Sequence, residues 1–218
     1  MIEFINRLKE FPTLKQYAEQ RKWDKGEGFI EANPKDDPSG RKARQLSVAS
    51  HLTGKPLVPS EALTLSGVIN PKHITTVKAT LFKTPYKETR YIAPIVLIHQ
   101  QFNLHHGYLE KGYWAYKNQI VGLPGFKPAE VETVSNFLRS HKRTLQAFVA
   151  GISIKLFTQH ATTLSELDIL SLPYPETDDL DLSFNEQILV DDIVDYYRDL
   201  IRLGEDSTAM KEGGHNAL

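Results

Sequence analysis

The apolar run at residues 93–98 (Ala-Pro-Ile-Val-Leu-Ile) constrains the fold of this 218-residue chain more than any other feature. It is short, rich in β-branched residues and bounded by a basic, aromatic segment at residues 82–91, so it predicts a buried strand. A second apolar run follows at residues 120–123. From Pro128 to Ile152 the apolar residues recur at helical spacing. Together these patterns predict an α+β fold in which a small mixed sheet, or several, is packed with helices.

Helices are also predicted at both ends of the chain. Residues 1–22 have the pattern of two short helices separated by Phe11-Pro12. Near the other end, a capping box of Ser183 and Glu186 predicts an acidic C-terminal helix that ends at Gly204.

Further elements have weaker signals in the sequence. Residues 68–82 alternate loosely and are predicted to be a strand. Thr163 and Glu166 predict another capping box, and residues 169–175, which end in Leu-Pro-Tyr-Pro, are predicted to be extended. We expect an α+β domain over residues 1–175, a linker and a helix packing on it over 176–207, and a disordered tail over 208–218.

Charge is distributed unevenly along the chain, although the net charge is only −1. Residues 1–34 carry 6 Lys and Arg against 6 Asp and Glu, residues 35–160 carry 17 against 7, and residues 161–218 carry 3 against 14. A net charge of +10 over residues 35–160 beside one of −11 over residues 161–218 is typical of contact with nucleic acid. A charged surface that serves solubility alone is the alternative.

Positive side chains interleaved with aromatic and polar ones make the basic middle a candidate for binding DNA. Lys and Arg would hold phosphates and set the register, while polar and aromatic side chains read base edges. The candidates for phosphate contact are Arg41, Lys42, Arg44, Lys83, Lys87, Arg90 and Lys117. The candidates for base contact are Tyr86, Tyr113, Trp114 and Asn118. Core packing is the alternative for each aromatic residue, and it is favoured for Trp114.

The sequence holds no catalytic or metal-binding motif. His105 and His106 would point to opposite faces of a strand, so we do not expect them to share a metal ion with His99. The acidic triplet in the last helix fits the exposed face of an amphipathic helix better than a Mg²⁺ site; it consists of Asp191, Asp192 and Asp195. No Walker loop, nucleophile elbow or Rossmann glycine set is present, and the glycines at 26 and 28 are expected to form a turn rather than to cradle a phosphate.

Composition indicates a soluble cytoplasmic protein without a membrane partner. The chain has no cysteine, which excludes disulfides and thiolate chemistry and fits a reducing compartment. No apolar run approaches the roughly 20 residues of a membrane span. The N-terminus alternates charged with apolar residues, unlike a signal peptide.

Three segments carry a family resemblance: residues 93–98, residues 116–123 followed by a helix, and residues 170–175. Weaker similarities lie at residues 26–30, 52–56 and 191–193. In this order they resemble the C-terminal target-recognition region of N6-adenine DNA methyltransferases, the class found in type II restriction–modification and in related phage-defence systems such as BREX. The resemblance extends over residues 13–207 and implies a domain that recognises a target in double-stranded DNA.

The methyl-transfer motifs of that family are absent. Its members hold the flipped adenine with an Asn-Pro-Pro-Tyr type motif and bind S-adenosylmethionine with a Phe-x-Gly-x-Gly-like loop. Residues 33–36 and 70–73 begin with Asn-Pro but lack the second proline and the aromatic residue. The resemblance therefore implies a specificity half that holds no cofactor itself, either a fragment of a longer methyltransferase or a separately encoded partner of a catalytic subunit. The alternative is a protein–protein interaction module whose acidic last helix docks a catalytic subunit or mimics DNA.

Overall fold

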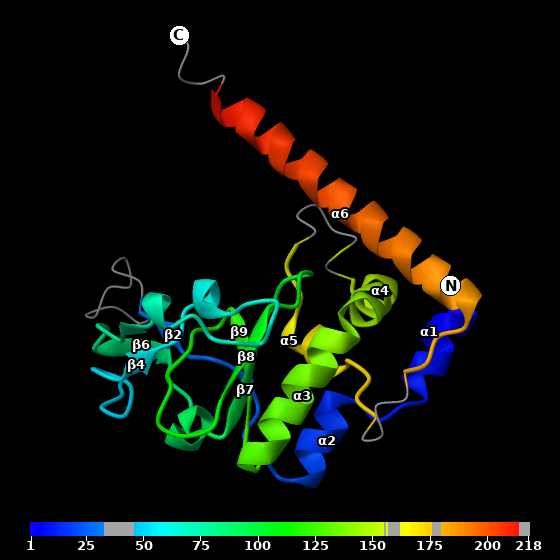
Figure 1. Ribbon diagram of the computed structural model, residues 1–218. Coiled ribbons are helices and arrows are strands. Elements are labelled where there is room, and N and C mark those ends of the chain that lie inside the picture. Colours follow the sequence, from blue (N-terminus) through cyan, green and yellow to red (C-terminus); the bar gives the residue numbers. More distant parts are fainter. Residues whose placement is uncertain (33–45, 155, 157–161, 176–179, 214–218) are drawn as a thin grey trace. The chain divides into compact units, whose positions relative to one another are not determined.

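The structure, a computed structural model, describes residues 1–32, 46–154, 156, 162–175 and 180–213, the last ten by their backbone alone (Figure 1). It divides into two compact units: unit 1 is Met1–Lys15 with His141–Leu218, and unit 2 is Gln16–Ser140. Both helices and small antiparallel sheets are present, so the predicted α+β fold is confirmed. Predictions that concern residues 33–45, Lys155, 176–179 and 214–218 lie outside the described residues. The predicted limits at residues 175 and 207 stay predictions.

A four-stranded antiparallel sheet forms the centre of unit 2. Its order is β1 (Gly26–Glu27), β9 (Ile120–Pro124), β7 (Ile95–His99) and β8 (His106–Leu109). Leu97 lies opposite Gly107 on one side and Gly122 on the other. The first four residues of β7 are fully buried, which confirms the predicted strand, and α3 (Pro128–Ser140) packs on β7 and β8.

Two smaller sheets complete unit 2. One has the order β2 (Ile30–Glu31), β6 (Leu81–Thr84) and β3 (Ser47–Val48), and the other pairs β4 (Pro56–Leu57) with β5 (Thr75–Thr76). Short 3-10 helices lie between these strands: η2 (Ser60–Ala62), η3 (Pro71–His73) and η4 (Glu88–Tyr91).

The predicted strand over residues 68–82 is wrong, because only β5 and the start of β6 are strands there. The Asn70 side chain accepts a hydrogen bond of 3.1 Å from the backbone N–H of Lys72. Pro71 provides the fixed φ of a helical first turn and has no N–H to give to a sheet. Local capping at Asn70 therefore replaces the expected strand with a 3-10 turn.

Close backbone approach explains the glycine pair at the start of unit 2. Gly26 has a φ of +134°, which disfavours any residue with a side chain. A Cβ at Gly28 would collide with the backbone carbonyl of Tyr116. The buried aromatic cluster beside it includes Phe29 and Phe82, whose ring centroids are 5.4 Å apart. The two glycines serve packing and a turn.

Unit 1 is built mainly of helices. They are α1 (Ile2–Lys9), the start of α2 (Leu14–Gln20), α4 (Lys142–Ile152), α5 (Glu166–Leu170) and α6 (Phe184–Gly213). The gap between α1 and α2 confirms the predicted interruption at Phe11-Pro12. Residues 169 and 170, predicted to be extended, belong to α5 instead. The segment after α5 pairs with the gap between α1 and α2, since Tyr174 N–H donates to the carbonyl of Pro12 at 2.7 Å.

Two predicted helices differ from the observed ones. The helical pattern from Pro128 is broken at His141, whose φ of −100° and ψ of 15° are not helical. The break arises because α3 packs on the sheet of unit 2, whereas α4 packs on α1 and α6. Helix α6 runs to Gly213, past the expected end at Gly204, since a glycine without a following proline costs a helix only about 1 kcal/mol.

Both predicted capping boxes fall near helix starts, but only one has the predicted residues. Ser183 accepts from the Glu186 N–H at 3.3 Å while the Glu186 carboxylate accepts from the Ser183 N–H at 2.9 Å, as predicted. At α5 the box is instead formed by Ser165 and Asp168. Asp168 is buried and also accepts from the Ser153 hydroxyl at 2.8 Å, so tertiary packing selects it over Glu166.

Candidate nucleic-acid interface

The two units carry opposite charge. Unit 2 has 17 Lys and Arg against 11 Asp and Glu, a net charge of +6. Unit 1 has 9 against 16, a net charge of −7. The asymmetry along the sequence is therefore also an asymmetry between two compact bodies.

Within unit 2, positive charge is concentrated on the segment that builds the two small sheets. Residues 51–87 contain a single acidic residue, Glu61. Five lysines lie on the same segment, before β4, in η3, after β5, on β6 and before η4: Lys55, Lys72, Lys78, Lys83 and Lys87. All are exposed except Lys55, which is half-buried. We call these five residues the lysine face.

Hydrogen bonds that continue the pairing of β4 with β5 bring parts of this face together. Gly54 N–H donates to the Val77 carbonyl at 2.9 Å, and Val77 N–H donates to the Lys55 carbonyl at 2.9 Å. The Thr53 hydroxyl donates to the Ala79 carbonyl at 2.8 Å. The backbone of Lys55 therefore lies beside that of residues 77–79, which include Lys78.

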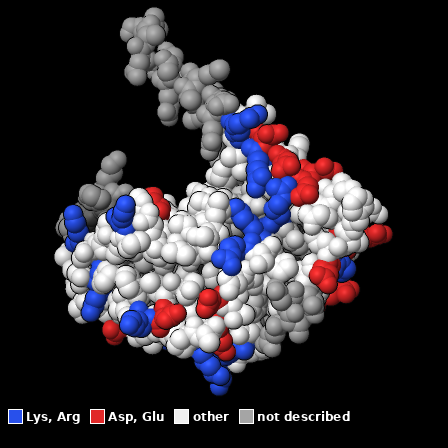
Figure 2. Space-filling model, viewed as in Figure 1, with Lys and Arg blue, Asp and Glu red and all other residues white. Residues whose placement is uncertain are grey.

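Strand β6 turns its lysine outward. Phe82 is fully buried in the core, and its neighbours Leu81 and Lys83 are exposed on the opposite face of the strand. Figure 2 shows Lys and Arg side chains over the end of the molecule that holds β4 and β6 in Figure 1. They are spaced apart on this face rather than merged into one patch.

Lys117 and Asn118 join this region through β2. Phe29, directly before β2, forms a bridge with Lys117 and accepts a backbone hydrogen bond of 3.2 Å from Asn118. The Lys117 ammonium group forms an ion pair of 2.8 Å with Glu31, and Asn118 is exposed. Since β2 also pairs with β6, these two predicted residues lie one strand away from Lys83.

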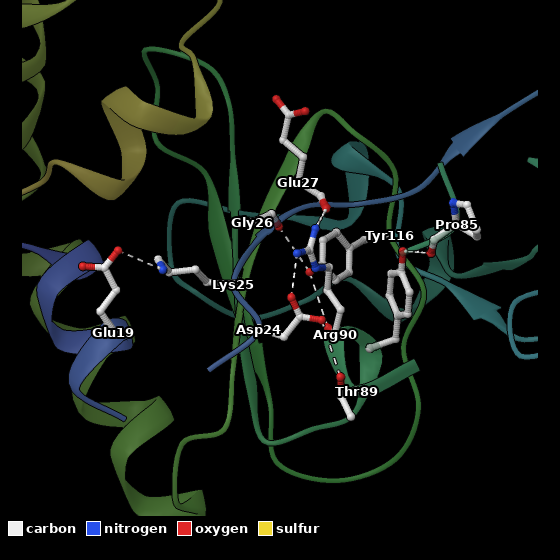
Figure 3. Close-up of polar contacts among 10 residues, drawn as sticks. Glu19, Asp24, Lys25, Gly26, Glu27, Pro85, Thr89, Arg90 and Tyr116 are labelled. Atoms are coloured by element: carbon white, nitrogen blue, oxygen red, sulfur yellow. Dashed lines mark hydrogen bonds and ion pairs between the residues drawn. The ribbon is translucent and has the colours of Figure 1, made fainter. Parts of the chain in front are cut away.

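Arg90 occupies a different environment from the other predicted phosphate contacts. Only 9% of the residue is exposed, and its guanidinium group forms an ion pair of 2.7 Å with Asp24 (Figure 3). It also donates to the backbone carbonyl of Glu27 at 2.9 Å. Burial acts to lower the pKa of Arg90, but the hydrogen bond and charge of Asp24 outweigh burial and raise the pKa above its usual value. Arg90 joins two distant segments of unit 2 and is not part of the lysine face.

Tyr86 lies against the buried Arg90 side chain. The Arg90 guanidinium carbon is 3.8 Å from the centroid of the Tyr86 ring, a cation–π contact, and Tyr86 has a φ of +56°. Its ring is half-buried. One face of the predicted base reader is therefore occupied by Arg90.

Tyr113 and Trp114 lie against the core of unit 2. The Tyr113 ring is 5.9 Å from that of Tyr91, and the Lys55 ammonium lies 5.2 Å from its centroid. Burial, followed by the charge of Glu88, raises the pKa of Tyr113. The indole N–H of Trp114 donates to the Lys111 carbonyl at 2.7 Å. These positions favour core packing, the alternative weighed for both residues, over base contact.

The remaining predicted phosphate contacts, Arg41, Lys42 and Arg44, lie outside the described residues. Sequence reasoning missed Lys55, Lys72 and Lys78, although the scarcity of acidic residues between positions 51 and 87 was a signal for them. Nothing in the sequence pointed to Asp24 as the partner of Arg90, because the two are 66 residues apart.

The histidines of the sheet are structural. His106 is buried, with Nε2 at 3.0 Å from the Ser135 carbonyl and Nδ1 at 3.3 Å from the Leu104 carbonyl. Burial lowers the pKa of His106 and that of His99. Across the part of the chain that the structure describes, no three His, Cys, Asp or Glu side chains gather closely enough to hold a metal ion.

Two acidic residues of α6, Asp191 and Asp195, form surface ion pairs with Arg143. The Arg143 guanidinium group on α4 lies 2.7 Å from the Asp191 carboxylate and 3.1 Å from that of Asp195. Burial acts to lower the pKa of Arg143, but the hydrogen bonds to these two carboxylates outweigh burial and raise it. The carboxylates thus help to hold α6 on α4.

No protein-family model matches this sequence, and no curated protein matches it with significant similarity. Among the helices of the described residues, none combines the length and the apolar character needed to cross a membrane.

Proposed function

We propose that unit 2 binds double-stranded DNA through the lysine face. The observation that carries the proposal is the set of five lysines with one acidic residue between positions 51 and 87, on the segment that builds the two small sheets. Lysine ammonium groups on exposed side chains suit phosphates, which supply most of the sequence-independent affinity for DNA. Lys117, half-buried beside Glu31, extends the face by one strand.

Reading of the DNA sequence falls to the polar residues at the edge of this face. Asn118 is exposed, and an asparagine side chain can form paired hydrogen bonds with an adenine edge. Tyr86 retains a half-buried ring beside Lys87. Tyr113, Trp114 and Arg90 are left out of the interface because of their packing in unit 2.

The finer proposal is that this chain selects the target of an N6-adenine DNA methyltransferase in a restriction–modification or phage-defence system. It is supported by the resemblance of residues 93–98, 116–123 and 170–175 to that family, and by the positive unit 2. Methyl transfer and S-adenosylmethionine binding then belong to a catalytic domain or subunit that works with this chain in the cytoplasm.

Binding to DNA is tested by fluorescence anisotropy with a labelled duplex between about 50 and 200 mM salt. With about six phosphates neutralised, the logarithm of the affinity should fall against the logarithm of the salt concentration with a slope of about −5. Changing Lys72, Lys78 and Lys83 together to Ala should weaken binding and reduce the slope by about 3. Binding that does not depend on salt would overturn the proposal.

The matched control is Lys127→Ala, which removes an exposed lysine of unit 2 on the segment leading into α3, outside residues 51–87. In Lys127→Ala the salt slope should change by less than one third of the change measured in the triple variant. Equal losses per lysine would mean that positive charge anywhere on unit 2 attracts DNA, and that the lysine face has no special role.

Target recognition is tested separately by selecting bound duplexes from a randomised pool. Enrichment of one adenine-containing sequence, lost in Asn118→Ala, would support the finer proposal. If salt-dependent binding is present but no sequence is enriched, backbone binding stands and target recognition by this chain alone is refuted.

A further inference from the structure

Helix α6 has two apolar faces, and unit 1 covers only one of them. Val190, Val194 and Tyr197 are buried, on the side where α4 packs. The second face is made of five apolar residues along four turns: Leu189, Ile193, Tyr196, Leu200 and Leu203. We call this second face the α6 seam.

The seam has the spacing of a coiled-coil contact. Its residues follow one another at intervals of four, three, four and three, which is the a/d pattern of a heptad repeat. Tyr196, Leu200 and Leu203 are 62%, 41% and 61% exposed, and the first two seam residues are half-buried. In Figure 1 the carboxyl-terminal half of α6 extends beyond α4, with no other helix of unit 1 beside it. Large apolar side chains on successive turns of one face are typical of a contact with a partner.

Charge along the two flanks of the seam narrows the kind of partner. Asp192 and Asp199 directly precede the seam residues Ile193 and Leu200, so they form the g row of the heptad. The opposite e row consists of Val190 and Tyr197, which are buried in unit 1. The open flank of the seam therefore carries two exposed carboxylates, and that of Asp199 also lies 3.8 Å from the Arg202 guanidinium group.

A second copy of this chain does not place positive charge beside Asp192 and Asp199. In an antiparallel pair the Asp192 and Asp199 row would face the same acidic row of the copy. In a parallel pair it would face Val190 and Tyr197, which are already buried. A helix with Lys or Arg beside its apolar stripe can pack on the seam and pair its positive charges with Asp192 and Asp199.

We propose that the α6 seam docks an amphipathic helix of another protein whose apolar stripe is bordered by Lys or Arg. The contact goes beyond DNA binding, since it uses unit 1 and none of the lysine face. An acidic helix that only mimicked DNA would have no use for three exposed apolar side chains at heptad spacing.

The test uses the full chain and a labelled four-heptad peptide with Leu at a and d and Lys at e and g. The like charges at e and g oppose self-association of the peptide. The control peptide carries Glu in place of Lys. We expect the basic peptide to bind at least ten-fold more tightly than the acidic one by fluorescence anisotropy. No binding, or equal binding of the two peptides, would overturn the proposal.

The seam itself is tested by the double variant Tyr196→Ser with Leu203→Ser, which should weaken binding of the basic peptide at least ten-fold. The matched control is Ile154→Ser with Leu167→Ser, because these residues of unit 1 are 81% and 62% exposed but lie outside α6. Circular dichroism should show unchanged helix content in both. If both double variants bind like the unchanged chain, the peptide is held by charge alone and the seam is refuted.

Reversing the charge of the acidic flank tests the preference for a basic peptide independently. Asp192→Lys with Asp199→Lys should transfer the preference from the basic to the acidic peptide, and an unchanged preference would contradict the assigned flank. Sedimentation of the unchanged chain should show a monomer. A dimer that the Tyr196→Ser, Leu203→Ser variant abolishes would make a second copy the occupant and overturn the proposal.

Discussion

Unit 2 and unit 1 each use an arginine to join segments that are distant in the sequence, but the two arginines lie at different depths. In unit 2 the side chains of Arg90 and Asp24 are 11% and 30% exposed, and their ion pair ties residue 24 to η4. Arg143 in unit 1 lies on the surface, where its side chain and that of Asp191 are 33% and 47% exposed. Removing one partner of a buried pair leaves an uncompensated charge, whereas a surface pair adds little to stability.

A positive residue counted in the sequence is not always available to bind a ligand. Arg90 counts toward the positive middle of the sequence, but its charge is neutralised inside unit 2. Four lysines of the lysine face are exposed and Lys55 is half-buried, and residues 51–87 contain one acidic residue. Only charges of the second kind are accessible to a ligand.

The largest effect is expected for Arg90→Ala. The variant leaves Asp24 and the Glu27 carbonyl without their partner, and unfolding free energy should fall by about 3 kcal/mol. Both tryptophans of the chain, Trp23 and Trp114, belong to unit 2, so their fluorescence during urea unfolding reports on this unit. A loss below about 1 kcal/mol would show that the pair behaves like a surface pair.

Gly28→Ala should be the next most destabilising change. The new Cβ meets the backbone carbonyl of Tyr116, which cannot rotate away, so we expect a loss of about 2 kcal/mol by the same fluorescence measurement. Gly54→Ala is the control. Gly54 has a φ of +79° but open space around it, and should cost about 1 kcal/mol from backbone strain alone. A loss near zero for Gly28→Ala would mean that the close approach to Tyr116 is relieved at no cost.

A smaller effect is expected from pH through His106. Burial lowers its pKa in the folded protein below the value of about 6.5 in the unfolded chain. The unfolded state therefore binds more protons as the pH falls through that value, and the stability of unit 2 should decline below about pH 6.5. His106→Gln should reduce this slope. An unchanged slope in His106→Gln would place the titration elsewhere.

The smallest effect is expected for Arg143→Ala. Its ion pairs with Asp191 and Asp195 are solvent-exposed, so unit 1 should lose less than about 1 kcal/mol, and less still at high salt. Circular dichroism at the helix band, with unit 2 followed by tryptophan fluorescence, separates the two units. A loss as large as that of Arg90→Ala would remove the distinction between the two arginines.

Local features predicted most of the elements correctly. The β-branched run at Ile95–Ile98, the interruption at Phe11-Pro12, the helix start at Pro128 and the Ser183–Glu186 box were all recovered. Each depends on neighbours within a few residues of sequence, because periodicity, proline geometry and capping are local properties of the backbone. The strand expected over residues 68–82 failed for a local reason too, since the Asn70 cap competes with the sheet.

The sequence by itself determined the α+β class, the central strand and the opposite charges of the middle and the tail. The tertiary structure alone decided which charges are accessible: it buried Arg90 against Asp24, 66 residues away, and left the lysines of residues 72–87 exposed. It also decided that α6 buries one apolar face and exposes the other. The physical reason is that burial and ion pairing depend on which segments meet in space, and no periodicity along the chain encodes those meetings.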